Sequence, residues 1–342
     1  MFGNPPSDDS PRSRRSGANP FITSAAPVSP APRQVRVARR TRPAVAPAAS
    51  AAPAAALPAD DLPVQVVPVR RLLSLTIGGF AALLTVGLIM GAQTSGVAQR
   101  LPYAIVVFGA QMLYVFATTM ALRPPGVKVV VVAGLLSALV ADYLANSPNE
   151  ATIGPLGLAA AGGLVLGVLG QIVLREGRVR VTETLGATTV IVVGVVAMAT
   201  LLVLVRIPLG TQAITVCLAS CGVALSVARF ADVLAPFPRL APQVARGAVG
   251  IVLGTMIGTG VAGYVGSFMV GFTPGSAAAV GAAAAAAAVL ADLTIGFAEA
   301  GRELAGDPPT MWLARHMQGP LAGFALAAPV AYLITNLIWQ AK

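Results

Sequence analysis

The chain has few charged residues for its length. Asp, Glu, Lys and Arg make up 11% of its 342 residues, whereas 56% of the residues are hydrophobic. A soluble domain carries about 25% charged residues, so this chain lacks the polar surface that a water-soluble fold of its size needs. The shortage excludes a soluble domain of normal size beyond residue 71 and indicates that most of the surface faces lipid or packed helices.

Cysteine and histidine are also scarce, which restricts the metal chemistry open to the chain. Cys217 and Cys221 are the only cysteines, and His316 is the only histidine. The two cysteines lie four residues apart in an apolar stretch and therefore share a helix face. A single metal site needs more ligands than two thiols, so we interpret both as small apolar packing residues.

Apolar runs, in contrast, fill the chain from Leu72 to Ile338. Each is long enough to cross a bilayer, for which an α-helix needs about 20 apolar residues. The nine predicted spans are approximately 72–92, 101–122, 128–145, 153–174, 187–205, 211–228, 247–272, 276–297 and 319–338. The sequence therefore predicts an all-α, polytopic membrane domain over residues 72–342, with short loops.

Positive charge alternates in step with these spans. If residues 1–71 face the cytoplasm, all but three of the 23 Lys and Arg residues lie on that side; the exceptions are Arg100, Arg206 and Lys342. The positive-inside rule thus predicts a cytoplasmic N-terminus, an external C-terminus and a multi-pass protein of a bacterial inner membrane. Because the arginines mark one membrane face, the net charge of +10 does not indicate nucleic-acid binding.

Residues 1–71 are rich in Pro, Ala, Ser and Arg and show no apolar periodicity. Such a segment cannot bury enough apolar surface to offset its ordering entropy, so we expect a disordered cytoplasmic tail. Its basic cluster between Arg33 and Arg42 has two interpretations. It binds anionic lipid or a partner protein, or it helps to hold the N-terminus inside, and we favour the second.

Residues 229–246 interrupt the pattern of spans. Pro236, Pro238 and Pro242 exclude a regular helix, while Phe237 and Leu240 keep the segment amphipathic. We expect this segment to lie along the cytoplasmic interface.

Small residues dominate the next two spans. Gly250, Gly254 and Gly258 recur at four-residue spacing in the seventh span, and the eighth span is largely alanine. Small residues at that spacing let helix backbones approach closely in lipid. We predict that the seventh and eighth spans pack tightly against each other. The glycine face would equally suit a second copy of the chain or another membrane protein.

Ionisable residues inside a membrane are costly and often functional, and Asp292 near the cytoplasmic end of the eighth span is the leading candidate. Glu299 and Glu303 follow it on the same helix face. Hard cations such as Mg²⁺ prefer oxygen ligands, so this stripe is a candidate metal or catalytic site. Alternatively, the helix simply becomes polar as it leaves the bilayer. Asp142, near the outer end of the third span, is interpreted as an interfacial carboxylate.

Basic residues near the same membrane face form a second candidate set. Arg302 is placed to pair with Glu299 or with the inner loops, and Arg315-His316 immediately precedes the ninth span. We predict that these residues, together with Arg246, contact a lipid phosphate.

Four short segments form a recognisable frame in the C-terminal region. They read Phe-Met-Val-Gly-Phe-Thr-Pro at 268–274, Leu-Ala-Asp-Leu at 290–293, Arg-His-Met-Gln-Gly-Pro at 315–320 and Ala-Ala-Pro-Val-Ala-Tyr at 327–332. This frame, mainly within residues 210–338, resembles the CTP:phosphatidate cytidylyltransferase family. The resemblance implies a fold of about eight or nine spans and an activity that makes CDP-diacylglycerol from CTP and phosphatidic acid with Mg²⁺.

Few of that family's charged positions are matched. Asp292 corresponds to the first Asp of a Gly-Asp-Leu-x-Glu-Ser motif, and His316 to the histidine of a Pro-Gly-His-Gly-Gly turn. Ile295 and Gly296 replace Glu-Ser, and Cys221 stands where an upstream acid is expected. Nucleotidyl transfer needs metal-bound carboxylates and cations around a triphosphate. The resemblance therefore favours a shared fold over a shared activity.

Three functions follow from these observations. The leading hypothesis is a non-catalytic relative with a lipid-sized cavity between the sixth and ninth spans, which binds a phospholipid or regulates a membrane enzyme. The second is an active cytidylyltransferase-like enzyme that uses Asp292 and cytoplasmic arginines. The third is a transporter or permease, which inverted repeats and broken mid-membrane helices would favour.

Overall fold

The computed structural model describes residues 70–95, 100–147, 151–174, 180–308 and 310–340. The predicted disordered tail lies almost entirely outside these residues; only Arg70 and Arg71 at its end are described. The predicted outer residue Lys342 also lies outside them.

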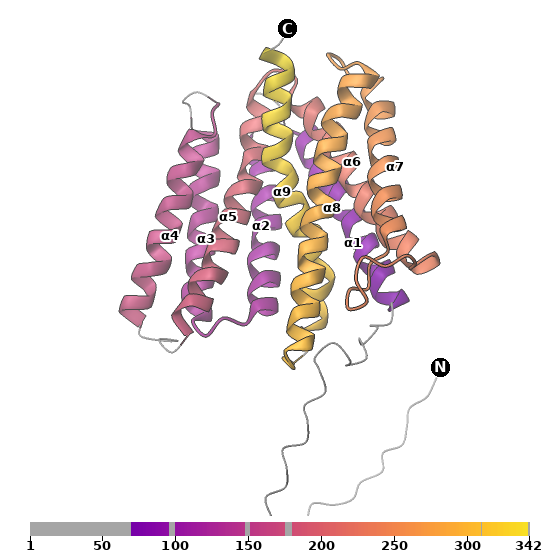
Figure 1. Cartoon of the computed structure of the whole chain (residues 1–342). Coiled ribbons are helices and arrows are strands. Elements are labelled where there is room, and N and C mark those ends of the chain that lie inside the picture. Colours follow the sequence, from indigo (N-terminus) through magenta and orange to yellow (C-terminus); the bar gives the residue numbers. More distant parts are fainter. Residues whose placement is uncertain (1–69, 96–99, 148–150, 175–179, 309, 341–342) are drawn as a thin grey trace, which may run out of the picture. The chain divides into compact units, whose positions relative to one another are not determined.

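The described residues form nine α-helices and no strand (Figure 1). They are α1 (Arg71–Gln93), α2 (Leu101–Leu122), α3 (Val127–Asn146), α4 (Gly154–Leu174), α5 (Val181–Arg206), α6 (Gly210–Leu234), α7 (Ala248–Gly266), α8 (Pro274–Leu304) and α9 (Trp312–Gln340). All nine are long and apolar enough to cross a membrane. The predicted all-α, polytopic membrane fold is confirmed.

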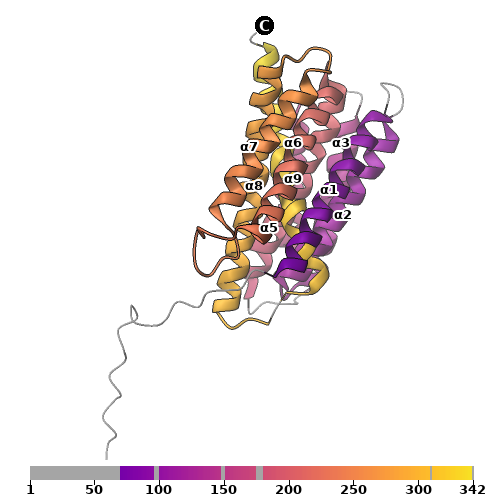
Figure 2. The same ribbon diagram turned by 90° about the vertical axis from the view of Figure 1, so that its right-hand side faces the viewer.

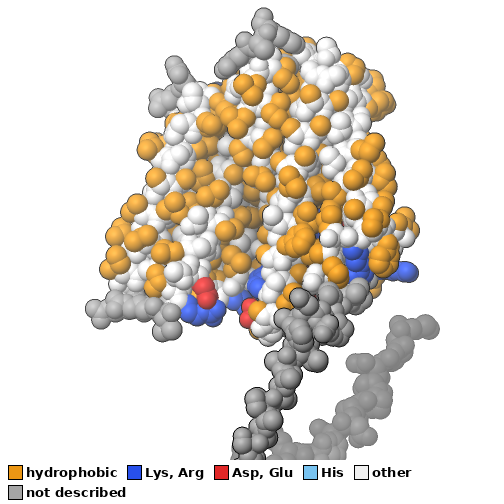
Figure 3. All heavy atoms as spheres, in the orientation of Figure 1, with side chains coloured by type: hydrophobic (Ala, Val, Ile, Leu, Met, Phe, Trp, Pro, Cys, Tyr) orange, Lys and Arg blue, Asp and Glu red, His pale blue; other side chains and the backbone are white. Residues whose placement is uncertain are grey.

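The helices stand roughly side by side and run alternately up and down, as two views at right angles show (Figures 1 and 2). The start of α1 and the end of α9 therefore lie at opposite ends of the membrane domain. We call the end at which α1 begins the charged end. On the visible face, Lys, Arg, Asp and Glu side chains gather there, whereas hydrophobic side chains cover the middle (Figure 3). An apolar belt with charge at its edge is the surface expected of a protein surrounded by lipid.

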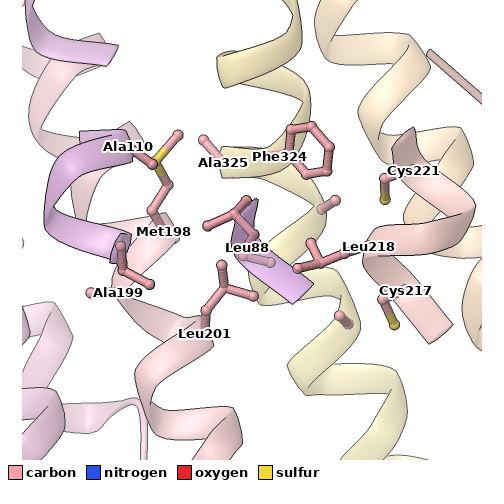
Figure 4. Packing of buried hydrophobic residues seen from close by; sticks show 14 of the residues in the cluster. Leu88, Ala110, Met198, Ala199, Leu201, Cys217, Leu218, Cys221, Phe324 and Ala325 are labelled. Carbon is pink, nitrogen blue, oxygen red and sulfur yellow. The ribbon is translucent and has the colours of Figure 1, made fainter. Parts of the chain in front are cut away.

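The core of the domain lies where α5, α6 and α9 meet the other helices. Leu218 and Cys217 of α6 pack in the same region as Leu88 of α1 and Phe324 of α9 (Figure 4). Cys217 and Cys221 are free, buried thiols within this apolar cluster. Their interpretation as packing residues is confirmed.

Several helix boundaries differ from the predicted spans. The helix α5 begins at Val181 instead of Ala187, and α7 ends at Gly266 instead of Phe272. The sixth span was expected to end at Ala228, but α6 continues to Leu234. Its first following proline is Pro236, which disfavours helical backbone only at the residue before it, so residues 229–234 remain helical. The ninth span was expected to begin at Gly319, but α9 begins at Trp312 and continues through Pro320. Membrane helices tolerate such a proline when surrounding helices support the backbone.

The glycine stripe of α7 packs on α6. A Cβ atom added at Gly250, Gly254 or Gly258 would lie 2.7, 2.5 or 2.6 Å from a backbone carbonyl oxygen of α6. The stripe thus permits backbone-to-backbone contact within one chain, and this face is not available to a second copy or another protein. The interface suggested from sequence for these glycines is therefore wrong for this face.

The helices α7 and α8 do pack together, as predicted, but through other small residues. A Cβ at Gly281 of α8 would lie 2.1 Å from Cβ of Ala262, and one at Gly266 of α7 would lie 2.1 Å from Cβ of Ala277. The alanine run of α8 supplies several buried residues of the core. Its predicted interior position is confirmed.

Candidate functional site

Four charged side chains meet inside the charged end of the domain. Arg229 and Asp232 come from the last turns of α6, Arg246 from the segment between α6 and α7, and Asp292 from α8. We call these four residues the charged cluster. The segment that carries Arg246 folds back on itself through an antiparallel bridge between Arg239 and Gly247. This fold brings Arg246 inward, whereas the sequence predicted that the whole segment lies along the interface.

Asp292 is fully buried, with 0% of its surface exposed. Its Oδ1 accepts a hydrogen bond from Nη2 of Arg229, and its Oδ2 accepts one from Nη2 of Arg246. Both carboxylate oxygens therefore serve as ion-pair acceptors. The side chain that the sequence proposed as a metal ligand is held by two guanidinium groups.

Asp232 completes the cluster from the extended end of α6. Its Oδ2 accepts from Nη1 of Arg246 at 2.8 Å, and its Oδ1 accepts from the backbone N–H of Gly247 at 2.9 Å. Asp232 was not predicted from the sequence, because the sixth span was expected to end before this residue. A helix continued to Pro236 would have put Arg229 and Asp232 on one face at three-residue spacing.

Arg246 is 2% exposed and bridges the two aspartates. Burial, together with the nearby Arg229 guanidinium, lowers the pKa of Arg246 to about 9, and the Asp232 carboxylate opposes this shift. The guanidinium is therefore charged at neutral pH. Arg246 was predicted to contact a lipid phosphate, but its Nη1 and Nη2 groups are committed to carboxylates inside the protein.

Two glycines let neighbouring helices reach the cluster. A Cβ at Gly319 of α9 would lie 2.1 Å from Oδ1 of Asp292, and a Cβ at Gly250 of α7 would lie 2.7 Å from Oδ1 of Asp232. Any larger residue at either position would have to displace a carboxylate that is already paired. The glycines thus explain how α7 and α9 close over the cluster.

A second set of ion pairs links α8 to α9 nearer the surface. Nε of Arg315 lies 2.5 Å from Oε1 of Glu299, and its Nη2 lies 2.6 Å from Oε1 of Glu303. The carboxylate stripe predicted on α8 exists, but its members face arginines from other elements. Arg302, predicted to pair with Glu299 or the inner loops, instead donates from Nη1 to the carbonyl of Ala121 at the end of α2. Arg302 therefore ties two helices together.

His316 lies one turn into α9 and is buried. Its Nδ1 lies 2.5 Å from the carbonyl oxygen of Trp312, and the two rings are 4.1 Å apart at their centroids. Trp312, Arg315 and His316 border the same surface groove. The predicted contact of Arg315 and His316 with a phosphate would therefore lie at this groove.

Two hollows open at the charged end. A cavity of about 120 Å³ lies against the charged cluster, and the positive and negative side chains around it are mixed. A larger groove of about 690 Å³ lies between the starts of α1 and α9. We call this second hollow the α1–α9 groove. It is lined by Arg70, Arg71, Leu72, Leu73, Thr76, Thr310, Trp312, Arg315 and His316. None of these lining residues, all within the described ranges, is acidic.

The residues at Asp292 do not fit the Mg²⁺ that the family resemblance implies. Mg²⁺ is held by oxygen ligands in near-octahedral geometry, and the groups facing Asp292 are guanidinium cations. Within the part of the chain that the structure describes, no three His, Cys, Asp or Glu side chains are grouped to hold a metal. No step of a metal-assisted reaction is therefore assigned to this site.

Asp142 lies apart from all these residues. It was interpreted as an interfacial carboxylate, but the structure places it in the interior, 7% exposed, where its Oδ1 accepts from Nε2 of Gln111 at 2.8 Å. Gln111 was not selected from the sequence, since a single amide in an apolar span carries no recognisable motif.

The candidate sites thus comprise an internally paired charged cluster, a basic surface groove and an isolated buried acid. The chain matches no protein-family model, no curated protein and no solved structure. The resemblance to the cytidylyltransferase family therefore stays a prediction that depends on the quoted residues.

Proposed function

We propose that this protein binds an anionic phospholipid at the charged end of its membrane domain and does not turn it over. The α1–α9 groove carries this proposal, because it combines basic and apolar lining residues and lacks an acidic one. The positive-inside rule assigns the charged end to the cytoplasm. The ligand would accordingly come from the inner leaflet of a bacterial inner membrane.

The basic part of the groove suits a lipid phosphate. Arg70 and Arg71 are exposed at the start of α1, and Arg315 approaches from α9. Guanidinium groups bind phosphate through paired hydrogen bonds, which makes Arg well suited to this role. Arg315 already pairs with Glu299 and Glu303, so Arg70 and Arg71 supply the charge that attracts an anionic headgroup.

The apolar part of the groove suits the glycerol backbone and the upper acyl chains. Leu72 and Trp312 are both exposed and lie beside the arginines. Tryptophan is enriched where the headgroup region meets the hydrocarbon, because its ring has an apolar body and a polar N–H. The groove thus offers basic side chains for a lipid phosphate together with aromatic and apolar side chains for the glycerol backbone and upper acyl chains.

The pairing of the cluster supports binding without catalysis. Nucleotidyl transfer needs carboxylates that hold metal ions and cations that are free to stabilise a triphosphate. Here Asp292 and Asp232 accept hydrogen bonds from Arg229 and Arg246. The active-enzyme alternative would require this network to open before a substrate could use it.

Fluorescence of Trp312 offers a direct test of the binding site. The chain has two tryptophans, so Trp339→Phe leaves Trp312 as the single reporter. We expect phosphatidylglycerol with brominated acyl chains to quench Trp312 more strongly than brominated phosphatidylcholine in the same vesicles. Arg70→Gln with Arg71→Gln should remove this preference, whereas Lys128→Gln, at the charged end but outside the groove, should keep it. Equal quenching by both lipids in the unchanged protein would contradict the proposal.

An activity assay separates this proposal from the enzyme alternative. Purified protein is incubated with labelled phosphatidic acid, CTP and Mg²⁺, with the Asp292→Asn variant in parallel. We expect no conversion by either protein. Product that forms with the unchanged chain and disappears in the variant would establish the enzyme.

A further inference from the structure

A buried acid and a buried amide form a pair inside the α2–α5 helices, away from the groove. Asp142 lies in the last two turns of α3, towards the end opposite the charged end, and is 7% exposed. Gln111 lies in the middle of α2 and is 0% exposed. The buried side chains of Val107 and Ala138 lie one helical turn before Gln111 and Asp142, and Val195 supplies a carbonyl to Gln111. The pair therefore occupies an interior of low polarity.

In the Gln111 side chain, the amide nitrogen makes hydrogen bonds but the amide oxygen does not. Its Nε2 donates to Oδ1 of Asp142 at 2.8 Å and to the backbone carbonyl of Val195 in α5 at 3.0 Å. These two bonds use both hydrogens of the amide nitrogen. Through them, Gln111 links α2 to α3 and to α5.

The remaining two oxygen atoms of the pair have no donor. Oδ2 of Asp142 and Oε1 of Gln111 are both buried without a hydrogen-bond partner. An ionised carboxylate and an amide oxygen can only accept hydrogen bonds, so neither atom can satisfy the other. Buried polar atoms are nearly always paired, and leaving one unpaired carries a large desolvation cost.

The other titratable groups on the surrounding helices do not supply the missing donor. Arg206 at the end of α5 donates from Nη1 to the backbone carbonyl of Ala145 at 2.7 Å. Tyr114 of α2 donates to the carbonyl of Val190, and the hydroxyl of Tyr103 is itself buried without a partner. Tyr143 of α3 is exposed, and α4 contains no titratable residue.

We propose that Asp142 is a proton-binding site, held as a neutral carboxylic acid whose Oδ2–H donates to Oε1 of Gln111. One proton supplies the donor that both unpaired oxygens lack. It also removes a negative charge from the membrane interior, where an isolated charge is costly. A metal cation is a poorer fit, because hard cations such as Ca²⁺ take about six or more oxygen ligands and this pair offers two unpaired oxygens.

The proton also has a mechanical consequence for the helices. With the proton bound, the acid and the amide share two hydrogen bonds across the contact between α2 and α3. Loss of the proton removes one bond and leaves two oxygen acceptors facing an apolar surrounding. Release of the proton would therefore weaken the contact between α2 and α3.

Infrared spectroscopy tests the protonation state directly. The full-length protein in proteoliposomes should show the carbonyl stretching band of a protonated carboxyl group at neutral pH. Asp142→Asn should lose this band, whereas Glu183→Gln, which changes an exposed carboxylate at the start of α5, should keep it. The absence of such a band from the unchanged protein, or its persistence in Asp142→Asn, would overturn the proposal.

Carbodiimide labelling gives an independent result on the unchanged chain, in case Asp142→Asn does not fold. A hydrophobic carbodiimide modifies protonated carboxyl groups in apolar surroundings and spares ionised, ion-paired ones. We expect peptide mapping by mass spectrometry to find the adduct on Asp142 at neutral pH, and not on Asp232 or Asp292. Labelling of the unfolded chain at all three positions is the control for peptide recovery. An unlabelled Asp142 in the folded protein would overturn the proposal.

Discussion

The charged cluster and the Asp142–Gln111 pair both bury carboxyl groups within a membrane domain, but they neutralise the charge by different means. In the charged cluster, Asp292 and Asp232 accept hydrogen bonds from Arg229 and Arg246. At Asp142, the bonded neighbour is a neutral amide. A buried charge must be paired or removed, so the first region uses arginine and, in our proposal, the second uses a proton. Replacement of the aspartate by its neutral amide should therefore be costly in the first region and nearly neutral in the second.

The largest expected effect is that of Asp292→Asn. It leaves the buried guanidinium of Arg246 and the partly buried guanidinium of Arg229 without their shared carboxylate. Removing one partner of a buried ion pair costs about 3–5 kcal/mol. We expect a large fall in the unfolding free energy measured in mixed detergent micelles. Glu183→Gln, an exposed change of the same kind, serves as the control and should alter stability by less than about 0.5 kcal/mol. A small effect of Asp292→Asn would show that the cluster does not depend on this carboxylate.

The next effect is that of Gly319→Ala, which tests the closure of α9 over the cluster. The added Cβ would lie 2.1 Å from Oδ1 of Asp292, so either α9 or the carboxylate must move. Overpacking of a buried site costs about 1–3 kcal/mol, and the same unfolding measurement should detect it.

Gly301 of α8 provides the matched control for this substitution. An added Cβ there meets nothing within 4 Å, and Ala is favoured over Gly in a helix by about 1 kcal/mol. Gly301→Ala should therefore be neutral or stabilising. A loss of stability equal to that of Gly319→Ala would indicate a general effect of the alanine rather than contact with Asp292.

A smaller effect is expected for Asp142→Asn, which sharpens the comparison. If Asp142 is already neutral, the amide replaces an acid of similar shape, and the unfolding free energy should change by less than about 1.5 kcal/mol, as for other volume-conserving changes. Asp142→Ala removes the partner of a buried amide and should cost about 1–3 kcal/mol. A fall for Asp142→Asn as large as that for Asp292→Asn would contradict the proposed difference between the two acids.

The smallest effect on stability is expected for Arg70→Gln with Arg71→Gln. Both side chains are exposed, and exposed substitutions usually change stability by less than about 0.5 kcal/mol. The same variant should nevertheless lose the preference for anionic lipid at Trp312. A parallel loss of stability and lipid preference would point to unfolding of the start of α1 rather than to a binding site.

The membrane fold was predictable because its signal is local. A run of about 20 apolar residues must form a helix in lipid, where every backbone polar group needs an internal partner. The nine predicted spans accordingly match the nine helices of the described residues. The boundaries were less predictable at Ala228 and Gly319, because charged or proline residues near a helix end do not by themselves decide whether the helix stops.

The candidate site was only partly predictable. Asp292 was found because a carboxylate within an apolar span is rare. Its partners Arg229 and Arg246 lie 63 and 46 residues away in the sequence, so no local pattern could pair them with it. Asp142 was selected but misplaced, because its distance from a predicted span end does not reveal whether the side chain faces lipid, water or another helix.

The sequence alone determined that this chain is an all-α membrane protein, since helix formation in lipid depends on residues close together in the chain. It also identified Asp292 and Asp142 as carboxylates within apolar spans. Only the tertiary structure decided that two arginines neutralise Asp292. It also decided that the glycine face of α7 packs on the backbone of α6. Those outcomes depend on which helices become neighbours, and helix packing in lipid is selected by close contact between distant segments.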